Sequence, residues 1–200
     1  MAIEKDFFRQ VMGRFATGVT VVTAKNEGTI GGITVNAFCS VSLNPPLVLV
    51  CIDLNSNTLP IMRSSGAFAV NMLTDQQEHL SRCFALPSAE RYEHFCHANY
   101  HTVATGTPIL DDVLAFVDAR IVAEYPGGDH AIFLGQVEAM GIGSKIALLD
   151  ESSHGALATL NGHIPVEEEN PLAYYRGQYR HLAIHYRQPS LATSPEQDRD

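Results

Sequence analysis

The fold is decided by residues 32–42, which have the sequence GITVNAFCSVS. Alternation of polar and apolar residues, several of them β-branched, is typical of a β-strand, here expected over about residues 30–41. Successive side chains of a strand point to opposite faces. One face carries Thr34, Asn36, Phe38 and Ser40, and the other carries Ile33, Val35, Ala37, Cys39 and Val41. The polar row faces either solvent or a planar, hydrogen-bonding ligand, and periodicity alone leaves both open. Gly31 and Gly32 lack side chains, so another group can approach the backbone there.

Strand-like segments lie on both sides of this stretch. Residues 17–23 are rich in β-branched side chains and end at a turn signal, and residues 47–52 are apolar on both faces, which predicts a buried strand. Further strands are expected over residues 67–73, 114–125 and 131–140, the last two joined as a hairpin by residues 126–129. Short helices are expected over residues 6–15, 58–63 and 75–84, and a long loop with a helical piece over residues 86–106.

At least six strands with only short helices predict a mostly β fold, an antiparallel split β-barrel rather than an alternating βαβ sheet. The sequence has no G-x-G-x-x-G motif after a strand, so a Rossmann domain is not supported. The chain has 200 residues, 46% of them hydrophobic, which suits one domain over residues 1–187. Residues 188–200 are polar and contain Pro and Ser, so we expect a disordered tail.

Charge and hydropathy exclude several partners. The formal net charge is −9 and no run of Lys and Arg occurs, so neither nucleic acid nor an anionic membrane surface would be attracted. A compact basic pocket for one phosphate remains compatible with this charge. No apolar run approaches the ~18 residues that a membrane span requires. We therefore expect a soluble protein.

The four cysteines are Cys39, Cys51, Cys83 and Cys96, and no two form a C-x-x-C pair. The first ten residues are charged and lack the apolar region of a signal peptide. Both features favour free, mostly buried thiols in a reducing compartment over disulfides. The sequence therefore predicts a cytoplasmic location.

Two turns carry polar groups suited to ligand binding. Residues 53–58 follow the buried strand and begin a helical turn, so their amide and hydroxyl groups form either a phosphate cradle or an ordinary capped turn. Residues 127–130 lie on the predicted hairpin. His130 is either exposed there or directed into a cleft, where an imidazole can contact an amide or a phosphate.

The nine histidines suggest a metal site at first sight. His94, His97 and His101 approximate the spacing of zinc ligands, with Cys96 beside them. No C-x-x-C or H-E-x-x-H motif accompanies them, so we expect no metal, although a histidine-metal hydrolase remains a rival that predicts stoichiometric metal. No G-x-S-x-G motif supports a serine hydrolase.

Taken together, the segments resemble the short-chain flavin reductase family, the reductase components of two-component flavin-dependent monooxygenases. The similar segments run in order from residue 7 to 182: residues 15–23, 32–38, 40–48, 55–58, 68–73, 84–85, 128–130, 135–137 and 171–179. The resemblance implies an FMN-binding split-barrel homodimer. It also implies that NADH or NADPH reduces FMN or FAD, and that an oxygenase component receives the reduced flavin.

The resemblance also implies residue roles. The isoalloxazine would be lined by Thr34, Val35, Asn36, Ala37, Phe38, Ser40 and Val41, largely through backbone groups. The ribityl chain would be flanked by Cys51, Ile52 and Asp53, and the phosphate bound by Ser56, Asn57 and Thr58. Phe84 and Ala85 would close over the tail of the flavin. His130, with Asp129 in the G-D-H motif, would lie at the nicotinamide as the catalytic residue, with Tyr174 or Tyr175 bordering the same pocket. The family often has a basic residue near the phosphate, for which Arg63 and Arg82 are candidates.

Hydride transfer needs no general base, only the stacking of a nicotinamide on a flavin, so the lack of a catalytic triad is expected. One rival is a flavin- or heme-binding split-barrel electron carrier or sensor without NAD(P)H-dependent turnover. Another is a pyridoxamine-phosphate-oxidase-like enzyme, which would require a more basic phosphate site than this acidic chain offers.

Overall fold

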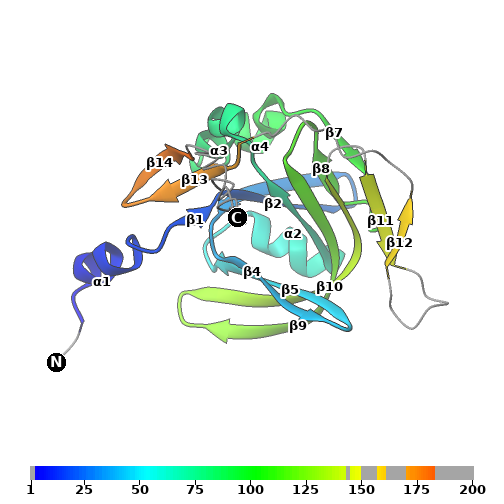
Figure 1. Cartoon of the computed structure of the whole chain (residues 1–200), viewed down its shortest axis with the longest axis horizontal. Helices are drawn as coiled ribbons and strands as arrows, with labels where there is room; N and C mark the ends of the chain where they lie inside the picture. The colour runs from blue at the N-terminus through cyan, green and yellow to red at the C-terminus, as the bar shows by residue number, and fades with distance from the viewer. Residues whose placement is uncertain (1–2, 143–144, 150–156, 161–169, 183–200) are drawn as a thin grey trace, which may run out of the picture.

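The computed structural model describes residues 3–142, 145–149, 157–160 and 170–182 (Figure 1). The strands are β1 (Thr17–Gly18), β2 (Thr20–Asn26), β3 (Thr29–Val35), β4 (Phe38–Leu43), β5 (Pro46–Asp53), β6 (Ala67–Met72), β7 (Tyr100–Thr102), β8 (Pro108–Leu110), β9 (Ala115–Gly127), β10 (His130–Ile142), β11 (Lys145–Leu149), β12 (Leu157–Leu160), β13 (Leu172–Tyr175) and β14 (Gln178–His181). The helices are α1 (Lys5–Met12), α2 (Thr58–Ser65), η1 (Asp75–Gln77), α3 (Glu78–Ala85), α4 (Ala89–His94) and η2 (Phe95–His97).

The main sheet is organised around β10, which pairs with three different strands. Strand β9 pairs along one edge of β10, while the other edge is shared by β5 over residues 130–136 and by β11 over residues 139–142. Strand β5 continues to β4, and β9 continues through β6 and β2 to β3. The two branches diverge from β10, and register shifts along the β9–β10 ladder bend it further. The predicted antiparallel split barrel is confirmed.

The main core lies between the sheet and α2. Met62, which is fully buried, packs there with Val22, Val50, Phe68 and Phe133. Helix α2 carries Pro60 in its first turn, where the missing N–H is tolerated, and it ends at Gly66 in the left-handed conformation (φ 66°). The helix that follows the predicted ligand turn is therefore fixed by its own core contacts.

A second core forms on the other side of β3, beneath α3. Phe84 is fully buried there and meets Phe95 edge-on, with the ring centroids 5.1 Å apart. A Cβ on Gly32 would lie only 2.6 Å from the Phe84 ring, so glycine is required for this close approach. Strand β3 is therefore covered by α2 on one face and by α3 on the other.

Helix α1 projects away from the body of the molecule (Figure 1). None of its residues is buried, although its apolar residues are spaced for one face. The exposed fractions are 60% for Phe7, 56% for Phe8, 52% for Val11 and 52% for Met12, and Phe15 beyond the helix is 72% exposed. This apolar face has no partner among the described residues.

The structure corrects two sequence expectations. Cys83 and Cys96 form a disulfide, contrary to the expectation of free, mostly buried thiols, whereas Cys39 is free and exposed and Cys51 is free and half-buried. The strand expected over residues 30–41 is two strands, β3 and β4, separated at Asn36 and Ala37. The predicted tail at residues 188–200 lies outside the described residues. Among the described helices, none is long and apolar enough to cross a membrane.

Candidate active site

A cleft of about 870 Å³ opens between α1, the segment around β1, the β3–β4 connection, β5 and the β13–β14 hairpin. Its size falls within the roughly 300–1,000 Å³ typical of small-molecule sites. Its lining consists of Phe8, Arg9, Met12, Gly13, Phe15, Ala16, Thr17, Gly18, Thr20, Asn36, Ala37, Phe38, Cys39, Leu49, Cys51, Tyr174 and Gly177. Helix α1, the β3–β4 connection and the β13–β14 hairpin thus face one another across the cleft.

The break between β3 and β4 forms one wall of the cleft. Asn36 and Ala37 lie between the two strands, and the amide of Cys51 on β5 donates a hydrogen bond of 3.1 Å to the carbonyl of Ala37. This bond fixes the break beside β5. The backbone at Asn36, outside either strand, borders the cleft together with the ring of Phe38. A flat ligand can therefore lie against backbone here.

Thr17 supplies the test of whether a hydrogen-bonding ligand fits. Its hydroxyl oxygen is buried and has no hydrogen-bond partner among the described residues, and the residue lines the cleft. A buried hydroxyl without a partner costs about 1–3 kcal/mol. Tyr174 is the partner of Thr17 across the β1–β13 ladder and lines the same cleft. An aromatic ring, apolar walls and an unsatisfied hydroxyl suit a planar ligand with polar edges, such as a flavin ring.

The turn at residues 53–58 lies at the end of β5. The Asp53 carboxylate accepts hydrogen bonds from the backbone amide of Asn55 (2.7 Å) and from its side chain (3.1 Å), so it is directed into its own turn. The Ser56 hydroxyl accepts a hydrogen bond from the amide of Thr58 (3.2 Å), the first residue of α2. Asn57 makes no capping hydrogen bond through its side chain.

His130 begins β10 directly beside this turn. It is the ladder partner of Asp53, and the amide of Leu54 donates to the carbonyl of Asp129 at 3.0 Å. The His130 Nδ1 lies 2.7 Å from a carboxylate oxygen of Asp129. This hydrogen bond, with the charge of His130, lowers the pKa of Asp129 below its usual value. Two residues further along β10, Ile132 pairs with the cleft residue Cys51 on β5. His130 therefore lies two residues along β10 from the strand position that borders the cleft.

The predicted site residues therefore divide into three groups. Those that line the cleft are Asn36, Ala37, Phe38, Cys51 and Tyr174, with Tyr175 adjacent at the end of β13. Those at the turn beside the cleft are Asp53, Ser56, Asn57, Thr58, Asp129 and His130. The remainder do not line this cleft: Thr34, Val35, Ser40, Val41, Ile52, Phe84 and Ala85.

The third group has identifiable contacts. Thr34 donates its hydroxyl to the carbonyl of Ser81 (2.6 Å), and the carbonyl of Val35 accepts from Thr20 (2.7 Å). Ile52 is a core residue, as is Phe84, whose ring faces Gly32. Residues 40 and 41 are exposed on β4. Ala85 lines a second hollow.

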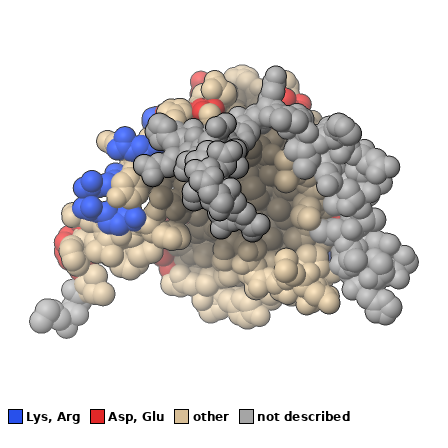
Figure 2. Space-filling view, in the orientation of Figure 1, with Lys and Arg blue, Asp and Glu red and all other residues tan. Residues whose placement is uncertain are grey.

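This second hollow, of about 540 Å³, shares Tyr174 and Gly177 with the cleft. Tyr179 lies edge-on to Tyr174, and the Arg82 guanidinium lies 4.7 Å from the centre of the Tyr179 ring. Figure 2 shows Lys and Arg side chains gathered where Figure 1 draws the β13–β14 hairpin. The protein is acidic overall, but this end of it is suited to an anionic ligand.

Sequence reasoning missed the contribution of residues 8–18 to the cleft. The available signal was the apolar spacing of α1, which predicted a helix but not the surface against which it would lie.

The histidine cluster shows no metal geometry. The rings of His94 and His97 stack with their centroids 5.3 Å apart, and His101 pairs with Asp111. The described residues hold no group of three or more potential metal ligands.

Comparison with known proteins identifies the family. A family model described as "Flavin reductase like domain" matches residues 12–183. The reductase component of 4-nitrophenol 4-monooxygenase/4-nitrocatechol 2-monooxygenase from Rhodococcus opacus is 32% identical over 192 residues, which cover 96% of this chain and 88% of the relative. The flavin-dependent monooxygenase reductase subunit HsaB from Mycobacterium tuberculosis is 30% identical over 177 residues, which cover 88% of this chain and 82% of the relative.

Solved structures agree with these relatives. The NADH:FAD oxidoreductase SgcE6 of Streptomyces globisporus C-1027, solved in complex with NAD and FAD fragments, matches with a TM-score of 0.72 and 29% identity. The match covers 92% of this chain and 95% of that chain. The fold and these relatives together define an oxidoreductase of the split-barrel flavin reductase class. The chain belongs to the flavin reductase family, and it is an NAD(P)H-dependent flavin reductase rather than a flavin carrier without turnover.

Proposed function

We propose that the cleft binds the isoalloxazine ring of FMN or FAD and leaves one face of the ring open to NADH or NADPH. The single observation that carries this proposal is the buried hydroxyl of Thr17, which has no partner in the described part of the chain and belongs to a residue that lines a cleft walled by backbone and aromatic rings. The flavin, when bound, supplies the hydride acceptor. The residues of the chain bind and orient both nucleotides and exclude water from them.

Each part of the cleft has a role in this proposal. Backbone groups at Asn36 and Ala37 hold the polar edge of the ring, while Phe38 and Tyr174 cover its apolar surface. The turn at residues 56–58 is proposed to bind a phosphate through its side-chain hydroxyl and amide groups, because the backbone amides of Ser56, Thr58 and Leu59 already donate within the turn. Ser40 and Val41, both exposed on β4, are assigned no direct contact.

His130 is proposed to orient the nicotinamide. Its Nδ1 is held by Asp129 at 2.7 Å, so the other ring nitrogen, Nε2, is free to contact the carboxamide or a phosphate of the incoming nucleotide. His130 pairs with Asp53 across the β5–β10 ladder, at the end of β5 where the proposed phosphate turn begins. This role positions the substrate and moves no proton.

The reduced flavin is proposed to pass to a separate oxygenase component. Two relatives are named as the reductase component or subunit of a monooxygenase, which supports this destination.

We also propose that a second copy of the chain covers α1. Its apolar residues are 52–60% exposed and also border the cleft, so a homodimer would bury them and complete the cleft wall.

A steady-state assay tests the activity. The purified protein is mixed with NADH or NADPH and with FMN or FAD, and the absorbance at 340 nm is followed in air. Flavin-dependent loss of absorbance supports the proposal. Tightly bound yellow flavin that NADH and NADPH fail to reduce would instead favour an electron carrier.

Sedimentation velocity tests the homodimer. A single monomeric species at micromolar concentration would contradict it.

A further inference from the structure

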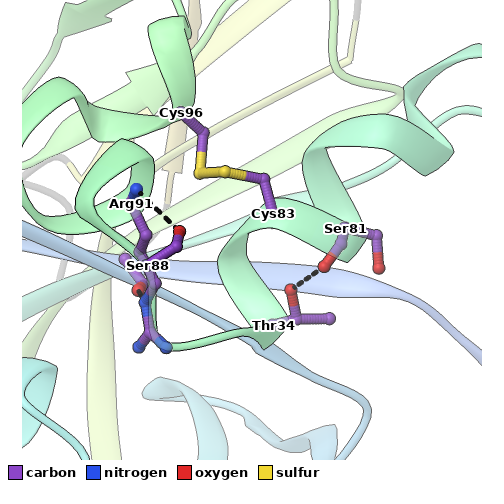
Figure 3. The surroundings of a disulfide bond; sticks show 7 residues. Thr34, Ser81, Cys83, Ser88, Arg91 and Cys96 are labelled. Carbon is purple, nitrogen blue, oxygen red and sulfur yellow. Dashed lines mark hydrogen bonds between the residues drawn. A yellow bond between two sulfur atoms is a disulfide. The ribbon is translucent and has the colours of Figure 1, made fainter.

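The four cysteines of the chain all lie in its described part and form two pairs. Cys83 and Cys96 are joined by the disulfide that links α3 to η2 (Figure 3), whereas Cys39 on β4 and Cys51 on β5 are both free. Both free cysteines line the cleft in which flavin binding is proposed. The free thiols of the protein therefore lie in the wall of its candidate active site.

The two free thiols lie on one face of the β4–β5 ladder. Cys39 pairs with Leu49, and Cys51 is two positions further along β5, so its side chain points to the same face as that of Leu49. Leu49 lines the cleft as well. Diagonal neighbours of this kind have Cα atoms about 7–8 Å apart and Cβ atoms somewhat closer. Burial and, second to it, the charge of nearby Cys39 raise the pKa of the Cys51 thiol, so the two side chains influence each other.

A disulfide between these thiols would require a small movement of β4. The Cα atoms of a disulfide usually lie about 4.4–6.8 Å apart, so β4 would have to approach β5 by roughly 1–2 Å. Among the described strands β4 pairs with β5 alone, and it lies between the break at Asn36 and Ala37 and a register shift between Ser40 and Ser42. Because the Cys51 amide holds the carbonyl of Ala37 (3.1 Å), this movement would distort the wall of the cleft.

The reaction of the family supplies an oxidant at this position. Reduced flavin that meets O2 instead of an oxygenase gives oxidised flavin and one hydrogen peroxide. Peroxide oxidises a thiol to a sulfenic acid with release of water, and a second thiol then forms the disulfide and releases a second water. Two thiols and one peroxide thus give one disulfide and two waters. Cys39 is the exposed thiol and meets the peroxide first, and the half-buried Cys51 is its partner.

We propose that Cys39 and Cys51 form an oxidative modification site, at which hydrogen peroxide from unconsumed reduced flavin closes a disulfide and lowers the flavin affinity of the cleft. The proposal rests on the proposed function, because it requires flavin to bind beside the two thiols. A reductase whose product no oxygenase takes up would in this way be inactivated. A dithiol would reduce the bond again and restore the cleft.

The wild-type protein tests this directly. Flavin-free protein is treated with hydrogen peroxide and desalted, after which mass spectrometry of unreduced peptides detects the bond and fluorescence titration measures FMN binding. We expect a peptide containing residues 39 and 51 to be lighter by two hydrogen atoms. We expect FMN binding to weaken by roughly tenfold or more, because a displacement of about 1 Å spoils aligned contacts. Oxidised protein that lacks this bond, or that binds FMN as tightly as before, would overturn the proposal.

Two variants separate the thiol pair from other damage by peroxide, and each is compared with its own untreated sample. Cys39→Ser should keep its FMN affinity after peroxide, because the first thiol is missing. Cys51→Ser should accumulate a sulfenic acid at Cys39, which dimedone traps, because the second thiol is missing. Dithiothreitol also reaches the Cys83–Cys96 disulfide, so its restoring effect on the wild type is measured beside Cys39→Ser. Equal loss of affinity in Cys39→Ser and the wild type would contradict the proposal.

Turnover tests the source of the peroxide. The wild type is incubated in air with NADH and FMN but no oxygenase, with and without catalase. We expect activity to fall over time, and we expect catalase to prevent both the fall and the Cys39–Cys51 bond. Inactivation that catalase does not slow would overturn the proposal. Protein that reduces flavin and forms no such bond would refute the modification site alone, whereas protein that neither binds nor reduces flavin would refute the proposed function.

Discussion

Thr17 and Tyr174 are direct partners across the β1–β13 ladder, and the Thr17 hydroxyl is buried without a hydrogen-bond partner among the described residues. Both residues line the cleft, and they come from segments more than 150 positions apart in the sequence. Among the described residues nothing satisfies this hydroxyl, and the ligand proposed for the cleft would do so.

Thr17→Val tests this relationship because it removes the hydroxyl and keeps the shape. We expect the ligand-free variant to be more stable by about 1 kcal/mol, because an unsatisfied buried group is lost. Flavin binding should weaken by roughly two- to tenfold, the value of one hydrogen bond. Urea unfolding and flavin fluorescence measure the two effects. A variant with unchanged flavin affinity would show that the hydroxyl does not contact the ligand.

His130→Ala should impair the use of the nicotinamide nucleotide and spare flavin binding. We expect KM for NADH to rise or the rate of flavin reduction to fall by about tenfold, because an orienting contact is removed. His79→Ala, an exposed histidine on α3, is the control. Stopped-flow reduction rates that match the wild type at every NADH concentration would remove His130 from the site.

The disulfide should contribute measurably to stability. A bond that closes a loop of about 15 residues is worth about 3 kcal/mol in the chain-entropy model. Cys83→Ser, or reduction with dithiothreitol, should therefore lower the midpoint of urea unfolding. Cys39→Ser, at an exposed free thiol, is the control and should leave the unfolding midpoint unchanged. Equal midpoints for oxidised and reduced protein would mean that the bond does not constrain the unfolded chain.

Asp118 on β9 makes stability depend on pH. It is fully buried and accepts hydrogen bonds from the amides of Ala104 (3.0 Å) and Thr105 (2.9 Å) and from the Thr105 hydroxyl. Burial outweighs these bonds and raises its pKa, so the folded state binds the proton more tightly than the unfolded state.

The sign of the effect follows from linkage. A carboxyl with a raised folded pKa contributes stability that is full below the unfolded pKa and is lost as pH rises through the folded pKa. On acidification from pH 7, wild type should therefore gain stability relative to Asp118→Asn. Urea unfolding of both proteins at pH 7 and pH 5 measures the difference, and a constant difference would contradict the assigned shift.

Much of the fold follows from local pattern. Alternating or uniformly apolar segments predicted β2, β5, β6 and the β9–β10 hairpin, because side-chain periodicity reports which faces are buried. The break between β3 and β4 could not be predicted, because the alternation continues through Asn36 and Ala37 without a proline or glycine. The break is instead stabilised by a long-range hydrogen bond from Cys51.

Only part of the site could be predicted from the sequence, again because local patterns do not encode tertiary contacts. The turn at residues 53–58 and His130 lie in local motifs, so the sequence could indicate them. Thr17 gains its significance from its pairing with Tyr174, a tertiary contact that no local motif encodes. The Cys83–Cys96 disulfide was missed because its two cysteines lie in a segment without a recognisable spacing.

The central claim is that flavin binds in the cleft beside Asn36, and blocking that cleft tests it most directly. Ala37→Trp places an indole in the cleft, and Val122→Trp places the same side chain at an exposed position on β9. Titration of FMN by fluorescence measures binding in both variants. Strong binding in Val122→Trp and at least 100-fold weaker binding in Ala37→Trp, with both proteins folded by circular dichroism, is the predicted result. FMN binding of equal strength in the two variants would contradict the account.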